Sequence, residues 1–123
     1  MTREAAKLLW DARLAADRVA RITANRSFED YLADEILRWA VERQLTIIGE
    51  ALSGLRRVDS PMAGNIPDLA RIVAFRNVLI HGYAVVDDRL VWGVIERNLD
   101  QLRTVLATLL KDAPVQDPDI DNS

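Results

Sequence analysis

Hydrophobic positions along the chain recur at helical spacing in four segments. The first predicted helix runs from about Thr2 to Ala24, and Asn25 and Arg26 end it. Its apolar side chains form one stripe, made of Leu8, Leu9, Ala12, Ala15, Ala16, Val19 and Ile22. A stripe of this kind is typical of a helix that packs on a core along one side.

The second segment runs from Phe28 to about Leu55 and begins with a capping-box pattern, because Ser27 precedes Asp30 by three residues. A change near Asp34 predicts a short helix followed by a long one. The apolar set proposed for this segment is Leu32, Ile36, Trp39, Ala40, Leu45, Ile47, Ile48, Ala51, Leu52 and Leu55.

Residues 56–68 are predicted as the one long loop, because they contain Asp-Ser-Pro and Gly-Asn. Pro67 suits the first turn of a third helix that reaches His81 and ends or bends at Gly82. Asp87 or Asp88 is expected to cap a last helix, whose apolar positions continue to Leu109. Strand-like alternation occurs only in residues 83–86. The pattern therefore predicts an all-α, up-and-down bundle of four to five helices.

The composition fits one globular domain, since half of the 123 residues are hydrophobic and 28% are charged. We expect this domain to cover residues 1–111. Residues 112–123 hold four aspartates and no basic residue, which predicts an acidic disordered tail. No apolar run approaches 18 residues and the start does not resemble a signal peptide, so a cytoplasmic protein without a membrane partner is expected.

The net charge of −3 becomes +1 for residues 1–111 once the four tail aspartates are left out. This disfavours a broad basic surface for nucleic acid but leaves a local phosphate site open. Of the 16 basic residues 14 are arginines, whose planar guanidinium suits phosphate. A GC-rich genome would produce the same excess, so the arginine count alone decides nothing.

One polar strip stands out on the third helix. At about 100° per residue, Asn77 and His81 lie on one face, and Arg76 and Tyr83 lie on a neighbouring face. A histidine can take or give the proton of a ribose 2′-OH or of a leaving oxygen, and an arginine can hold the phosphate charge. Asn77 would orient the substrate or the imidazole. Because one histidine cannot easily be both acid and base, a symmetric dimer would supply the second one.

A purely structural role for the same residues is the alternative. His81 would then satisfy the last carbonyls of its helix, Arg76 would be a surface or ion-paired residue, and Tyr83 would be a half-buried core aromatic. A metal site is not expected, because the chain has one histidine, no cysteine and no fitting carboxylate spacing. No cofactor motif is visible either.

The motif Arg76-Asn77-x-x-x-His81-x-Tyr83 resembles the Arg-x4-His-x-Tyr signature of the HepT-like branch of the HEPN ribonuclease toxins. Residues 40–51, with the sequence AVERQLTIIGEA, are similar to a further segment of that family. Ile66-Pro67, Val86-Asp87 and Val91-Trp92 also fit, so the resemblance covers about residues 1–111. Asp68 departs from it, because the family has an apolar or aromatic residue after Ile-Pro.

The resemblance implies an all-α homodimer with a cleft at its interface, which is lined by Arg76 and His81 of both protomers. It further implies a metal-independent endoribonuclease toxin, with Asn77 as a supporting residue. The antitoxin would be a cognate MNT-type nucleotidyltransferase that adds AMP to Tyr83. A bulky anionic adduct there, one helix face from His81, would block the cleft. RNA is the implied substrate.

A second strip lies in the long segment, where Ile36, Ala40, Arg43, Ile47 and Glu50 follow each other at spacings of four and three. Arg43 and Glu50 are therefore candidate supporting residues at the dimer seam or at the cleft edge. The alternative is an ordinary solvated helix face with a weak ion pair.

Two alternatives to the toxin stay open from the sequence. The first is a catalytically silent helical module that binds a nucleotidyltransferase partner or a nucleotide, and the second is a plain dimeric bundle. Expression alone and together with the neighbouring reading frame separates toxin from silent module, because only a toxin impairs growth alone and is rescued by its partner.

Overall fold

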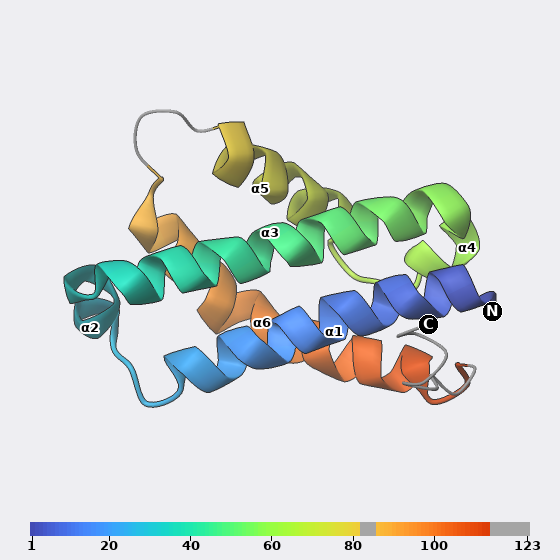
Figure 1. Cartoon of the computed structure of the whole chain (residues 1–123), viewed down its shortest axis with the longest axis horizontal. Coiled ribbons are helices and arrows are strands. Elements are labelled where there is room, and N and C mark those ends of the chain that lie inside the picture. Colours follow the sequence, from blue (N-terminus) through green and yellow to red (C-terminus); the bar gives the residue numbers. More distant parts are fainter. Residues whose placement is uncertain (82–85, 114–123) are drawn as a thin grey trace, which may run out of the picture.

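The computed structural model describes residues 1–81 and 86–113, and the described chain is all-α (Figure 1). Its helices are α1 (Arg3–Thr23), α2 (Phe28–Ala33), α3 (Glu35–Val58), α4 (Ser60–Ala63), α5 (Leu69–His81) and α6 (Asp88–Leu110). The four long helices, α1, α3, α5 and α6, alternate in direction along the chain, and α2 and α4 are short connecting helices. The up-and-down, all-α bundle is thus confirmed.

Local capping fixes where most of these helices begin. The side chains of Thr2, Asp34 and Asp59 accept hydrogen bonds from backbone N–H groups of α1, α3 and α4. Ser27 and Asp30 form the predicted capping box at α2, and each side chain accepts a bond from the other's backbone. Of the two residues expected to cap α6, Asp87 and Asp88, it is Asp87 that forms the cap.

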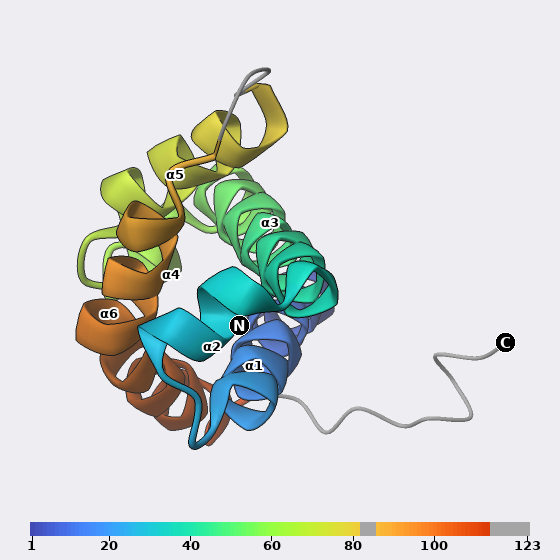
Figure 2. The ribbon, with the colours of Figure 1, turned by 90° about the vertical axis from the view of Figure 1, so that its left-hand side faces the viewer.

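The core lies between α1, α3 and α6, with α2 closing one end (Figure 2). Four small residues of α1, namely Ala5, Ala12, Ala15 and Ala16, are fully buried, and α1 packs chiefly against α3 and then against α6. Tyr31 and Trp92 fill the end at α2. No helix within the described ranges is long and apolar enough to cross a membrane.

The prediction of one long loop over residues 56–68 is wrong. Helix α3 continues to Val58, and α4 follows at Ser60. Asp59 explains both facts, because its backbone N–H bonds to the Leu55 carbonyl while its carboxylate accepts from Met62 N. The Asp-Ser-Pro signal marked a helix start, with Pro61 in the first turn, rather than an irregular turn.

The third predicted helix starts two residues later than expected. Asp68 has a φ of 58°, which lies in the left-handed region, and so α5 begins at Leu69 and excludes Pro67. The helix reaches His81 as predicted. Gly82, Tyr83 and the predicted alternating stretch up to residue 85 lie outside the described residues, as do residues 114–123 of the predicted tail.

Part of the apolar set proposed for the second segment is not core. Leu32, Ile36 and Trp39 are exposed, with 75% of the surface of Ile36 and 61% of that of Trp39 open to solvent. Val41, which that set omitted, is buried instead. Helix α3 therefore presents an apolar stretch on its outer face near its N-terminus.

Helix α5 is the least embedded of the long helices. It packs chiefly against α3, at the edge of the bundle (Figure 2). Of its 13 residues only Val73 is buried. The helix that carries the predicted motif is thus held from one side and is open on the other.

Candidate functional site

Arg76 lies where α5 crosses α3, directly against Gly49. A Cβ atom built on Gly49 would lie 2.4 Å from Arg76 Cβ, 2.9 Å from its Cγ and 3.2 Å from its Cδ. Nonbonded carbon atoms normally keep about 3.5 to 4.0 Å, so the close crossing requires a glycine at this position. The arginine stem is therefore packed between the two helices.

The guanidinium of Arg76 is not neutralised by a carboxylate of the described chain, because no ion pair to it is found there. Its Nε atom is buried and has no hydrogen-bond partner among the described residues. A buried, unpaired donor on a charged group is costly. Arg76 is thus a cation whose binding capacity the described fold does not use, which is the state that an anion-binding residue requires.

Asn77 and His81 are exposed on the outer side of α5. With Arg76 facing α3, they are rotated from it by about 100° and 140° round the helix. His81 is the last residue of α5, one and a half turns beyond Arg76, which is a rise of about 7.5 Å. The C-terminal half of α5 thus carries a cation, an amide and an imidazole within two helical turns.

Arg43 and Glu50 are exposed on α3 and lie about 10.5 Å apart along its axis. On a helical wheel that starts at Gly49, both lie about 100 to 120° from the α5 side, opposite the core. Among described residues neither has an ion-pair partner. The face is exposed, as the alternative of a solvated helix face expects, but the weak ion pair of that alternative is not formed within the described part of the protomer.

The outer faces of α3 and α5 form one continuous surface. The two helices run antiparallel (Figure 1) and bury the same flank against the bundle, so their opposite flanks point outward together. Arg43, Glu50, Asn77 and His81 belong to this surface, and Arg76 lies in the seam between the helices. Tyr83 lies outside the described residues. Within those residues no three His, Cys, Asp or Glu side chains gather as metal ligands.

Two features of this surface were missed in the sequence. Gly49 was not recognised as the contact of Arg76, although a glycine inside a long helical pattern is a signal for a close approach. Trp39 was placed in the core, although it lies four residues before Arg43, on the outer strip of α3. A Trp at spacing four from an exposed Arg was the signal available for it.

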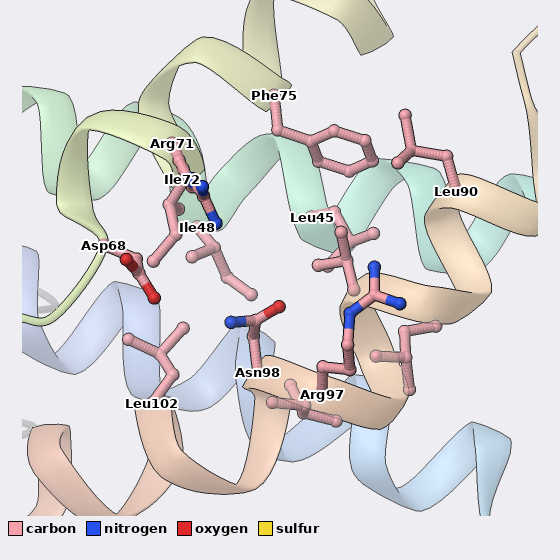
Figure 3. Close-up of a pocket in the computed structure, with 13 residues that line it drawn as sticks. Leu45, Ile48, Asp68, Arg71, Ile72, Phe75, Leu90, Arg97, Asn98 and Leu102 are labelled. Carbon is pink, nitrogen blue, oxygen red and sulfur yellow. The ribbon is translucent and has the colours of Figure 1, made fainter.

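A separate cavity of about 440 Å³ lies between α3, α5 and α6 (Figure 3). Its walls are mainly apolar, with Phe75 and Leu90 at the top and Arg71, Asp68, Arg97 and Asn98 around the rim. Arg43, Glu50, Arg76, Asn77 and His81, the sequence-predicted site residues that the structure describes, do not line it. The cavity thus lies on the inner side of α5, away from Asn77 and His81.

Known proteins are similar to this chain over most of its length. The model of the family described as "Ribonuclease HepT-like" matches residues 12–109. A Thermococcus cleftensis protein named "Probable ribonuclease HepT" is 32% identical over 113 residues, which cover 90% of this chain and all of that protein. A Methanocaldococcus jannaschii protein, named as a candidate RNase, is 28% identical over 101 residues, covering 82% and 92% of the two chains. No solved structure matches.

The family match runs from the middle of α1 to the last turn of α6, and it includes Gly49, Arg76 and His81. It agrees with the resemblance seen in the motif and with the all-α bundle. The chain therefore belongs to the HepT-like ribonuclease family.

Proposed function

We propose that this protein is a metal-independent endoribonuclease toxin that acts in the cytoplasm and cleaves RNA at the outer surface of α3 and α5. The observation that carries the proposal is Arg76, which has no carboxylate partner among the described residues and lies one and a half turns before His81 in a HepT-like fold. An arginine held in this way suits a phosphodiester, because the guanidinium keeps its charge and offers several donors.

In the proposed reaction the ribose 2′-oxygen attacks the adjacent phosphorus while the bond from phosphorus to the 5′-oxygen breaks. An imidazole accepts the 2′-OH proton, and an imidazolium returns a proton to the leaving 5′-oxygen. Arg76 holds the phosphate and stabilises the negative charge that develops on it. Asn77, exposed beside His81, orients the substrate or the ring. The products are a 2′,3′-cyclic phosphate and a 5′-OH end.

The proton transfers at two oxygens favour a homodimer, in which each protomer contributes one His81. Charge on α3 supports a specific arrangement. If two α3 helices pack antiparallel about a two-fold axis between Thr46 and Ile47, Arg43 meets the partner's Glu50, and Glu50 meets the partner's Arg43. Both are exposed and without an ion-pair partner in the described protomer, and Trp39 adds exposed apolar surface.

The same two-fold axis would pass close to Arg76 and His81. Arg76 lies opposite Gly49, and α5 runs antiparallel to α3, so His81 lies about level with Gln44. The middle of the span from Arg76 to His81 is thus level with Thr46 and Ile47, where the charge pairing places the axis. Two copies would present their Arg76 and His81 to one shared cleft.

The dimer is tested by charge reversal, with sedimentation and RNA cleavage measured together. Arg43→Glu or Glu50→Arg alone places like charges opposite each other, and we expect a monomer with little activity. The double variant Arg43→Glu/Glu50→Arg restores opposite charges and should recover dimer and cleavage. A dimer that is unchanged in both single variants contradicts this arrangement.

Cleavage itself is tested with purified protein and RNA in EDTA. Wild type should cleave, while His81→Ala and Arg76→Ala should lose at least about 100-fold in rate, in line with the contribution of an acid–base or oxyanion-stabilising group. Arg71→Ala is the matched control, because it removes one guanidinium from the inner side of the same helix. Cleavage that persists in both site variants means that the site is wrong. No cleavage by any of them favours the silent module.

The regulatory part of the proposal is that a cognate MNT-type nucleotidyltransferase transfers AMP to Tyr83 and thereby inactivates the toxin. An adenylyl group two residues after His81 would add an anion and bulk beside the cleft. Mass spectrometry of protein co-expressed with the neighbouring reading frame should show one AMP on the peptide that contains Tyr83. An adduct on another residue, or none together with growth rescue, contradicts this mode of neutralisation.

A further inference from the structure

The contact of Gly49 with Arg76 differs from those of the other helical glycines. At Gly54, also in α3, an added Cβ would lie 3.3 Å from the tip of Leu8, and at Gly93 in α6 it would meet the flexible end of Arg97. At Gly49 it would meet the Cβ of Arg76 at 2.4 Å, and a Cβ cannot move without its helix. Only at Gly49, among these helical glycines, does a methyl group force one helix away from the other.

The contact also fixes the arginine side chain. Its Cβ, Cγ and Cδ all lie within 3.2 Å of the place where a residue-49 side chain would begin, and Nε is buried behind them. Only the terminal nitrogens are left to extend from the seam. A guanidinium held in this way loses little conformational entropy when it binds a phosphate.

We infer that Gly49 is a positioning residue for the reaction: by lacking a side chain, it sets where the guanidinium of Arg76 stands relative to His81. The inference rests on the proposed function, because it assigns Gly49 to the same site. Gly49 itself touches no substrate. Glycine has a cost at this position, since glycine in a helix interior destabilises the helix relative to alanine.

The first test compares Gly49→Ala with Gly54→Ala, a matched control on the same helix. Alanine favours the helix equally at both positions, so Gly54→Ala should cleave within about twofold of wild type. Gly49→Ala displaces Arg76, and its kcat should fall at least about tenfold with KM changed less than about threefold. Equal cleavage by Gly49→Ala and wild type overturns the inference while leaving the proposed function standing.

The second test distinguishes positioning of Arg76 from a general structural role. Arg76→Gly removes the Cβ that clashes, so Gly49→Ala should lower the urea midpoint of the wild-type protein and should raise or preserve that of the Arg76→Gly variant. The guanidinium ion should restore part of the activity of Arg76→Gly, and adding Gly49→Ala to that variant should lower the restored rate less than about twofold.

The restored activity of the double variant decides between the two roles of Gly49. A loss of about tenfold in restored activity in the double variant shows that Gly49 acts on something other than Arg76 and overturns the inference. If Gly49→Ala alone does not fold, the folded double variant still decides the question through its restored rate. Wild-type protein that cleaves no RNA overturns the proposed function, and the inference with it. In that case the urea midpoints still test the contact between Gly49 and Arg76, because Gly49→Ala should lower the midpoint of wild type but not that of Arg76→Gly.

Discussion

The rings of Tyr31 and Trp92 lie 5.2 Å apart, centroid to centroid, at an angle of 37°, and they join α2 to α6. Tyr31 is fully buried, and the ring centroid of Phe28, also in α2, lies 6.5 Å from that of Trp92. This cluster closes the end of the bundle where α1 turns into α3. Burial also raises the pKa of the Tyr31 phenol above its usual range, mainly by desolvation.

The hydroxyl of Tyr31 has no hydrogen-bond partner within the described part of the chain. Removing it in Tyr31→Phe keeps the ring contact and eliminates the desolvation cost, so the free energy of unfolding should rise by about 1 kcal/mol. Tyr31→Ala should lower it by about 3–5 kcal/mol. Urea unfolding followed by circular dichroism measures both. A loss in Tyr31→Phe would show that the hydroxyl is bonded in solution.

The capping box at α2 gives a second prediction. Ser27→Ala removes the acceptor for Asp30 N and should lower the free energy of unfolding by about 1 kcal/mol. Ser60→Ala is the control, because no side-chain cap is formed by Ser60 in the described residues. Thermal unfolding compares the two, and equal Tm values for them would contradict the capping role of Ser27.

Asp30 adds a pH dependence. Its hydrogen bonds from Ser27 lower its pKa in the folded protein. The stabilisation is therefore present above the ordinary aspartate pKa and is lost as the pH falls through the lowered value. Asp30→Asn should reduce the Tm at neutral pH, and the difference from wild type should vanish in strong acid. A difference that grows toward low pH would contradict this sign.

The pKa of Glu42 is shifted in the opposite direction to that of Asp30. Burial first, and the Asp88 carboxylate second, raise its pKa in the folded protein, while Arg38 acts against them. The charged form is therefore disfavoured by folding, and stability is lost as the pH rises through the raised pKa. Glu42→Gln should have a higher Tm than wild type at neutral pH and the same Tm below the ordinary glutamate pKa. Glu96→Gln, an exposed site on α6, should show no such difference.

Arg76→Lys tests the shape of the cation apart from its charge. Lysine keeps the three carbon atoms that pack on Gly49 and the positive charge, but it lacks the planar group with paired donors. RNA cleavage should fall at least about tenfold from wild type and stay above that of Arg76→Ala. Arg71→Lys is the control, and activity equal to wild type in Arg76→Lys would show that charge alone suffices.

Most of the fold was readable from the sequence, because the core stripes of α1 and α6 and the capping box at Ser27 are local signals. The errors have physical causes. Asp59 ends one helix and caps the next, which a pattern of turn residues does not distinguish from a loop. The left-handed backbone of Asp68 delays the start of α5.

The candidate site was predicted by residue type and resemblance, but not by packing. A helical wheel placed Asn77 and His81 together, and it could not show which helix Arg76 faces. Exposure of Ile36 and Trp39 was also missed, because an apolar residue at helical spacing looks the same whether the fold or another molecule covers it. The contact of Gly49 with Arg76 joins positions far apart in the sequence, so a glycine inside the helical pattern signals a close approach but does not show which residue makes it.

Because α5 is supported from one side only, the free energy of detaching α5 differs from the free energy of unfolding the whole bundle. Global unfolding must disrupt the buried contacts among α1, α3 and α6, whereas detaching α5 exposes Val73 and the partly buried Leu69, Ile72, Phe75 and Leu79 and breaks the contacts of α5 with α3. The segment that bears Arg76 and His81 is therefore the long helix that opens at the lowest free energy. Backbone amides of α5 then exchange with solvent deuterium at rates set by local opening, independent of the stability of the rest of the bundle.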